Sequence, residues 1–235
     1  MNNAPISAWV ANLGKYNEGE LVGTWINFPI NKDDLQKILH DKVLIGTTDE
    51  FGQPYEEYGI FDWESDYVDY PGEWENLDTI NEWAEYIDSL EEYELDVLVA
   101  AKEAGYVDNV LDFDPNNYCL YYNVNTPKDL GYYEIDNIWG GIEYVDADII
   151  KKYFDYEALG RELDFDLWGD NEESAGEYWC GREEALNYDI GVAYVDELGM
   201  EGVKNPENYF DYEAYGESIA AYEGEFTSKG FIYET

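Results

Sequence analysis

The chain has 235 residues with 55 Asp and Glu against 12 Lys and Arg, which gives a formal net charge of −43. This balance argues against nucleic acid or an anionic membrane as a partner, because binding to either requires patches of Lys and Arg. The chain is also 45% hydrophobic and 17% aromatic. That content is ample for buried cores and predicts a folded protein instead of a disordered acidic tail.

Compartment and redox state are predicted from what the sequence lacks. No apolar run approaches the roughly 18 residues of a membrane-spanning helix, and the N-terminus lacks the basic-then-apolar pattern of a signal peptide. We therefore predict a cytoplasmic protein. Cys119 and Cys180 are far apart and in no metal-ligand spacing, which favours free thiols over a disulfide.

The first 42 residues are almost neutral, with 5 acids and 4 bases. Ile6 to Asn12 and Glu20 to Phe28 are β-branched, aromatic or alternating, and they predict a hairpin with a turn between them. Asn31 is positioned to cap a short helix after Pro29. A third strand is predicted around Tyr58 to Trp63.

Charge accumulates from Val43 to Ala101, a tract with 18 acids and neither Lys nor Arg. Aromatic side chains lie between the carboxylates, so the tract can fold. From Glu75 the apolar period becomes helical, and a second helix is predicted over Glu91 to Ala104 with Gly105 as its stop. The acids of these helices read as a solvated face, yet no Lys at i,i+4 offsets their repulsion.

After Gly105 the pattern predicts strands and turns through Asn137, and then a repeat appears. Residues 153–163 (YFDYEALGREL) and 209–219 (YFDYEAYGESI) are identical at seven of eleven positions, 56 residues apart. This identity predicts two related units in which each copy forms a helix or turn packed on a sheet. Glu225 to Tyr233 is predicted to be a last strand.

The predicted fold class is therefore α+β, an elongated chain of three to four small domains. The predicted boundaries are 1–70 for an N-terminal hairpin and helix unit, 71–105 for an acidic helical unit, 106–165 for an inserted or duplicated unit, and 166–235 for a related C-terminal unit.

Residues capable of chemistry are few. His40 is the only histidine, so no histidine-based triad or His-rich metal site is expected. No glycine-rich phosphate loop is present, and Asp112 to Asn123 departs from a calcium loop at its sixth and twelfth positions. Loose divalent-ion binding at Asp164, Asp166 and Asp170 stays open as counterion screening. We predict no metal, no cofactor and no catalytic residue.

The charge itself is then the candidate working part. At one charge per about 1.7 Å of duplex axis, 43 charges correspond to about 73 Å, or about 21 base pairs. Carboxylates on a rigid backbone could replace phosphates in a Lys- and Arg-lined groove. Halophilic adaptation would spread acids over the whole chain, and the near-neutral opening counts against it.

The sequence also resembles a known family. Residues 9–30 (WVANLGKYNEGELVGTWINFPI) are similar to the N-terminus of the ArdA antirestriction proteins, and residues 193–219 (AYVDELGMEGVKNPENYFDYEAYGESI) with the closing GEFTSKGFIY are similar to their C-terminal domain. The resemblance implies an elongated, curved, dimeric DNA mimic that inhibits type I restriction-modification enzymes by occupying the DNA groove of the methyltransferase core.

The chain departs from the family in length. One copy of the YFDYEA module would suffice, so an extra copy, Tyr106 to about Phe165, is predicted to be inserted before the family's C-terminal unit. A basic residue follows the module's glycine at Arg161 but is replaced by Glu217 in the second copy. The family's antirestriction motif would fall near Asp189 to Gly202. Its apolar residues suit packing or a homodimer seam, and the candidates are Ile190, Val192 and Val195.

The hypothesis is thus an inhibitor without catalysis, whose partner is the methyltransferase core of a type I enzyme. The predicted phosphate-imitating acids are Asp62, Glu64, Asp66, Asp69, Glu73, Glu75, Asp78, Glu82, Glu85, Asp88, Asp155, Glu157, Asp211 and Glu213. Two alternatives stay open: an acidic carbohydrate-active enzyme with a Glu pair and an aromatic platform, and an acidic chaperone for basic DNA-binding proteins.

Overall fold

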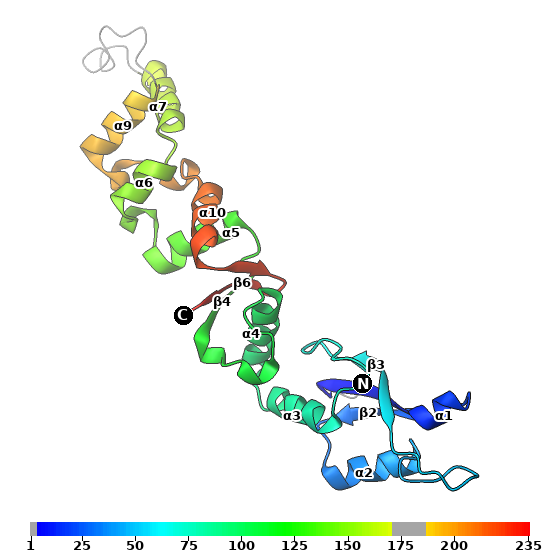
Figure 1. Ribbon diagram of the computed structural model, residues 1–235. Coiled ribbons are helices and arrows are strands. Elements are labelled where there is room, and N and C mark those ends of the chain that lie inside the picture. Colours follow the sequence, from blue (N-terminus) through cyan, green and yellow to red (C-terminus); the bar gives the residue numbers. More distant parts are fainter. Residues whose placement is uncertain (1–3, 171–186) are drawn as a thin grey trace. The chain divides into compact units, whose positions relative to one another are not determined.

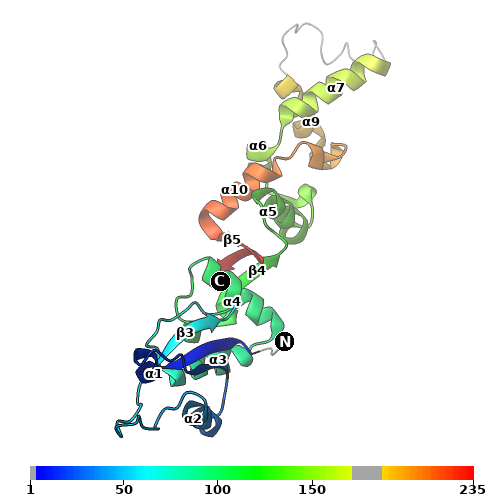
Figure 2. The same cartoon turned by 90° about the vertical axis from the view of Figure 1, so that its right-hand side faces the viewer.

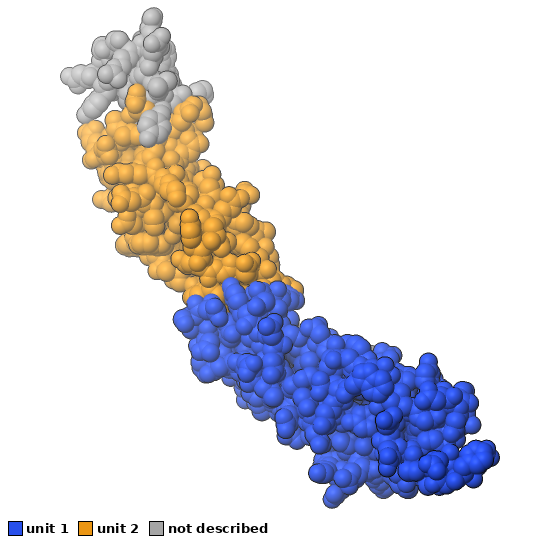
Figure 3. Space-filling view, in the orientation of Figure 1, with its two compact units in different colours: residues 1–120, 234–235 blue, residues 121–233 orange. Residues whose placement is uncertain are grey.

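The computed structural model describes residues 4–170 and 187–235, without the side chains of residues 164–170, 187, 188 and 190. It contains helices and two small antiparallel sheets (Figure 1), which confirms the α+β class. The chain forms two compact units, residues 1–120 with 234–235, and residues 121–233 (Figure 3). The four predicted domains, their boundaries and their elongated arrangement stay predictions.

Unit 1 begins with a three-stranded sheet in the order β2-β1-β3. Its strands are β1 (Ile6–Asn12), β2 (Gly23–Phe28) and β3 (Tyr58–Glu64). Both pairings are antiparallel, and alternate side chains of the central strand β1 are fully buried. The predicted hairpin and third strand are confirmed. A short helix, α1 (Leu13–Asn17), lies where a turn was predicted, because the side chain of Asn12 caps it.

Three further helices of unit 1 follow the sequence predictions closely. They are α2 (Lys32–Asp41), α3 (Leu77–Asp88) and α4 (Glu92–Glu103). Asn31 and Asn76 cap α2 and α3 through their side-chain oxygens, and Glu91 forms a capping box with Glu94 at α4. Each helix therefore begins at a residue whose side chain satisfies a free backbone amide.

The segment after α4 contains two single turns of 3-10 helix, η1 (Val110–Asp112) and η2 (Pro115–Asn117), and then strand β4 (Tyr118–Tyr122). The prediction of strands and turns through Asn137 holds only up to β4. It is wrong for residues 127–137, which belong to α5 (Pro127–Tyr133) and a continuing π-helix, η3 (Glu134–Trp139). Thr126 and Asp129 form a capping box that starts this helix.

Unit 2 is mainly helical. After α5 it contains η4 (Ile142–Tyr144), α6 (Ala147–Tyr153), α7 (Tyr156–Asp170), α9 (Asn187–Leu198), η5 (Met200–Gly202), η6 (Pro206–Asn208) and α10 (Tyr212–Glu223). The strands β5 (Glu225–Thr227) and β6 (Gly230–Glu234) form a hairpin, where a single last strand was predicted, and the sheet order is β4-β6-β5.

Both copies of the repeat form helices, but they pack on helices and not on a sheet as predicted. α7, which begins at the fourth residue of the first copy, packs against α9, and α10, which begins at the fourth residue of the second, packs against α5. These two helix pairs are visible in both ribbon views (Figures 1 and 2). The buried aromatic side chains of both copies, Phe154, Tyr156, Tyr209, Phe210, Tyr212 and Tyr215, lie together in one core cluster.

Candidate partner-binding surface

Helix α3 separates its apolar and acidic residues onto different faces. Its buried side chains are Leu77, Ile80, Ala84 and Ile87. Its exposed acids are Asp78, Glu82, Glu85 and Asp88. Within the described part of the chain, none of these four carboxylates has a basic partner. The face that α3 turns to solvent therefore carries four charges that no basic side chain neutralises.

Strand β3 presents two more predicted acids by simple alternation. Asp62 and Glu64 are exposed, while Phe61 and Trp63 between and beside them are half-buried. Successive side chains of a strand point to opposite faces. Because β3 is hydrogen-bonded along β1, both carboxylates stand on a rigid edge of the sheet.

The connection from β3 to α3 carries Asp66 and Asp69, both exposed. It is held in place by side-chain hydrogen bonds to the backbone. The indole Nε1 of Trp63 donates to the carbonyl oxygen of Val68 at 2.8 Å, and the hydroxyl of Tyr70 donates to that of Ile60 at 2.7 Å. The aromatic residues of the acidic tract thus order the backbone that holds the acids.

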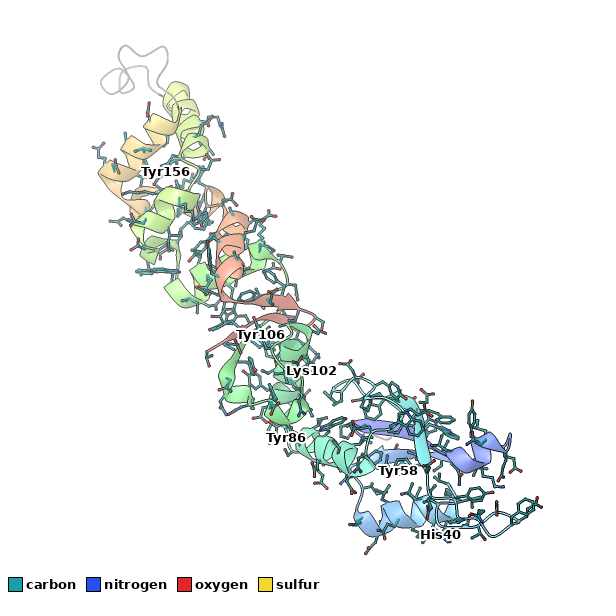
Figure 4. All side chains as sticks on the ribbon, viewed as in Figure 1. His40, Tyr58, Tyr86, Lys102, Tyr106 and Tyr156 are labelled. Carbon is teal, nitrogen blue, oxygen red and sulfur yellow. The ribbon has the colours of Figure 1, made fainter. Side chains whose placement is uncertain are left out.

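Lys102 is the first basic residue after the acidic tract, and its side chain is only 19% exposed. Figure 4 labels Lys102. Its ammonium donates to the carbonyl oxygen of Tyr67 at 2.8 Å and to Oδ2 of Asp69 at 3.2 Å. No pattern in the sequence indicates this role, because Lys102 is 33 residues from Asp69 and resembles an ordinary helix-end lysine. Lys102 fixes the connecting segment and partly neutralises Asp69.

Two of the predicted acids are less available than the others. Glu73 and Glu75 are half-buried. The carboxylate of Glu75 accepts the amide of Asn76 at 2.9 Å, and the backbone carbonyl of Glu73 accepts the amide of Ile60. Trp74 between them is 70% exposed, and no pattern in the sequence distinguished it from a core tryptophan.

The predicted acids of unit 2 are all exposed, but three have local roles. Asp155 and Asp211 cap their helices by accepting the amides of Ala158 at 2.8 Å and Ala214 at 3.0 Å. The sequence signal that could have predicted this capping role is an Asp directly before a helical run. Glu157 forms an ion pair with Arg161 at 2.9 Å. Glu213 has no basic partner among the described residues.

Two residues that the sequence singled out for possible chemistry have local polar partners in the structure. His40 is exposed at the end of α2, with Nδ1 at 2.9 Å from Oδ1 of Asp41. Asp114 accepts the amide of Asn116, which holds the pKa of Asp114 below its usual range. No group of His, Cys, Asp and Glu among the described residues is arranged to hold a metal ion.

Some predictions fall at the limits of the described residues. Cys119 is a half-buried free thiol in β4, whereas Cys180 lies outside the described residues. The side chains of Asp164, Asp166 and Asp170 lie outside the described side chains. Among the helices that the structure describes, none has the length and apolar character to cross a membrane.

Comparison with known protein families bears on this acidic surface. Residues 8–169 match the family model described as antirestriction protein (ArdA), which covers more than half of the chain. The chain belongs to the ArdA antirestriction family. The resemblance identified from residues 9–30 is thereby confirmed, and membership implies an antirestriction function directed at type I restriction-modification enzymes. No curated protein was found to match the chain.

The ArdA match includes the first YFDYEA copy and ends before the second. It also includes the whole segment 106–165 that was predicted to be an insertion. Val192 and Val195 lie beyond the match and pack, half-buried, against the core cluster of unit 2. The side chain of Ile190 lies outside the described ones, and the role of these three residues at a homodimer seam stays a prediction.

Proposed function

We propose that this ArdA family member inhibits a type I restriction-modification enzyme by imitating B-form DNA and occupying the DNA-binding groove of the methyltransferase core. The observation that carries the proposal is the set of exposed acids on β3, on the β3–α3 connection and on α3, which basic side chains leave almost unneutralised. The backbone beneath them is fixed by the sheet, by helix capping and by aromatic hydrogen bonds.

The spacing of the acids supports the comparison with DNA. From Asp78 to Asp88 the helix rises about 15 Å at 1.5 Å per residue, so its four exposed carboxylates stand about 5 Å apart along the axis. One strand of duplex DNA carries a phosphate per about 3.4 Å. The two charge densities are of the same order, and a carboxylate forms the same charge-assisted hydrogen bonds with Arg and Lys.

Competition is the direct test. The purified protein is titrated into a type I methyltransferase bound to fluorescently labelled duplex, at about 50 mM and about 200 mM salt. We expect displacement of the duplex, weaker at the higher salt because screening reduces attraction between exposed charges. Failure to displace the duplex at both salt concentrations would contradict the proposal.

A matched pair of variants locates the surface. The triple variant Glu82→Gln, Glu85→Gln, Asp88→Asn and the triple variant Glu20→Gln, Asp33→Asn, Asp41→Asn change net charge equally. We expect the first to weaken binding about threefold or more, since exposed charge pairs contribute about 0.2–1 kcal/mol each. The second, in the near-neutral opening, should change binding less than about twofold.

The remaining alternatives predict different results. A chaperone for basic proteins would bind polylysine as tightly as it binds the methyltransferase, whereas a DNA mimic prefers a groove that fits a duplex. A carbohydrate-active enzyme would release reducing sugar ends from polysaccharide substrates. Family membership favours the inhibitor over both.

A further inference from the structure

The two YFDYEA copies meet each other inside unit 2. Phe154 of the first copy lies opposite Phe210 of the second in an antiparallel bridge. The amide of Asp155 donates to the carbonyl oxygen of Tyr209 at 2.6 Å, and the amide of Asp211 donates to that of Tyr153 at 2.8 Å. Equivalent residues of the two copies therefore exchange equivalent hydrogen bonds.

The same exchange occurs where the helices pack. A Cβ atom on Gly191 of α9 would lie 2.0 Å from the carbonyl oxygen of Tyr156, the first residue of α7. A Cβ atom on Gly131 of α5 would lie 2.0 Å from the carbonyl oxygen of Tyr212, the first residue of α10. Gly131 and Gly191 are therefore structurally equivalent, although the segments around them show no identity as clear as YFDYEA.

This equivalence extends the repeat beyond its eleven residues. The first half contains α5, α6 and α7, and the second contains α9 and α10. The YFDYEA helix of the first half, α7, packs on α9 of the second half. The YFDYEA helix of the second half, α10, packs on α5 of the first half. Contacts in which residue i meets j while j meets i define the isologous interface of a two-fold pair.

The halves also share one hydrophobic core. The core cluster contains apolar and aromatic side chains from both: Ile135, Ile142, Val145, Ile150, Phe154, Tyr156 and Leu159 from the first, and Val203, Tyr209, Phe210, Tyr212 and Tyr215 from the second. Val192 and Val195 pack against this cluster. Separating the halves would expose these side chains to water, at about 25 cal/mol per Å² of apolar surface.

We propose that residues 126–170 and 187–223 are a single-chain pair, in which the YFDYEA module binds its own second copy through a two-fold contact that would otherwise join two chains. The surface lined by Val192 and Val195 is then closed within one chain and is not a homodimer seam. This inference is independent of the proposed inhibition.

Joining both halves in one chain lets them differ in charge, which a homodimer of identical halves cannot do. Arg161 neutralises Glu157 in the first half at 2.9 Å. Glu217 occupies the equivalent position in the second half and adds a charge beside Glu213. At these positions the second module helix therefore carries more negative charge than the first, which suits a partner whose two contact regions are not identical.

Disulfide trapping tests the pairing. The flanking hydrogen bonds make Phe154 and Phe210 a non-hydrogen-bonded antiparallel pair, whose Cα atoms are typically about 4.5 Å apart. That spacing lies in the range of about 4.4–6.8 Å that a disulfide requires. In a Cys119→Ser, Cys180→Ser background, Phe154→Cys with Phe210→Cys should form a disulfide within one chain, detected as a monomer on a non-reducing gel with loss of both free thiols.

A mixture of the two single variants, Phe154→Cys and Phe210→Cys, is the matched control. The mixture should give no more disulfide-linked dimer than either variant alone, because the two halves of each chain pair with each other. Abundant mixed dimers, or a double variant that links chain to chain or retains both thiols, would overturn the proposal.

The unaltered sequence provides a measurement that does not depend on replacing two buried phenylalanines. Unlabelled and ¹⁵N-labelled chains are unfolded together, refolded and cross-linked with a lysine-reactive reagent, and the peptides that link a lysine of the first half to Lys204 of the second are weighed. We expect pairs that are both light or both heavy. Mixed pairs in the proportion of random association would show that the halves pair between chains.

Discussion

Gly131 lies against the backbone of Tyr212, so closely that a Cβ atom would stand 2.0 Å from the Tyr212 carbonyl oxygen. Only the absence of a side chain allows α5 and α10 to approach to this distance. Gly191 meets Tyr156 in the same way, so a glycine lies at the close contact of each helix pair of unit 2.

Gly131→Ala should therefore destabilise unit 2 by about 1–3 kcal/mol, the usual range for overpacking, although alanine is the better helix former. Gly191→Ala should have an effect of similar size. Urea denaturation followed by circular dichroism measures both. Ile138→Ala is the control, since Ile138 is exposed and its loss should stay within about 0.5 kcal/mol. Equal stability of Gly131→Ala and the native chain would refute the close contact.

Asn12 is a buried polar side chain at the centre of unit 1. Its Nδ2 donates to the carbonyl oxygen of Val43 at 2.9 Å, and its Oδ1 accepts the amide of Lys15 at 2.9 Å. Asn12→Ala leaves both partners unsatisfied and should destabilise unit 1 by about 1–3 kcal/mol. Unfolding in urea, monitored by tryptophan fluorescence, measures the loss. Ser7→Ala is the control, because its hydrogen bond to Asn27 is exposed.

The acidic surface should behave as many weak contacts. A single change such as Glu82→Gln should raise the inhibition constant by less than about fivefold, since one exposed charge contributes about 0.2–1 kcal/mol. Neutralising all ten predicted acids from Asp62 to Asp88 should abolish inhibition and flatten its salt dependence. Methylation assays at two salt concentrations measure both. If one neutralisation alone removed inhibition, a distributed imitation of DNA could not be correct.

A charge reversal in the second half of unit 2 tests whether the predicted acids of that unit also contact the enzyme. Glu217→Arg creates an i,i+4 partner for Glu213, as Arg161 already is for Glu157. If the second half contacts the enzyme, inhibition should weaken about threefold or more. Asp33→Lys in α2 changes net charge by the same amount and should have a smaller effect. Equal effects of both substitutions would assign the change to net charge alone.

Glu134 should make the stability of unit 2 depend on pH. Burial raises the pKa of this carboxyl, and the charge of Glu223 raises it further. A raised pKa means that the folded protein binds the proton more tightly than the unfolded chain, so this contribution stabilises at low pH and is lost as the pH rises. Glu134→Gln should therefore raise the melting temperature at pH 7, and this gain should disappear below the ordinary value of 4.5. The exposed Glu143→Gln is the control for loss of one charge.

Local elements were predictable because each rests on neighbouring residues. Asn31 and Asn76 precede the helices that they cap, and the apolar period from Leu77 to Ile87 is visible in the sequence. The helix over residues 127–139 was mistaken for strands and turns. Its aromatic-rich sequence fits either structure, and packing against α10, about 80 residues later, is a contact that no local pattern contains.

The sites divide in the same way. Composition shows that the acids outnumber the bases. Periodicity predicted exposed acids between Asp62 and Asp88, and eight of the ten predicted there are exposed. The cap role of Asp155 and the burial of Lys102 beside Tyr67 depend on particular three-dimensional neighbours. The sequence therefore indicates the acidic surface but not which of its charges already have a partner within the protein.

The sequence by itself determined the family, the α+β class and the unbalanced charge, because motifs, periodicity and composition are properties of the chain before it folds. Only the tertiary structure decided how the two YFDYEA copies are used. Each copy could have packed on its own preceding helix, and the choice to exchange partners depends on close backbone contacts at Gly131 and Gly191. Those contacts join residues far apart in sequence, and their geometry exists only in the folded unit.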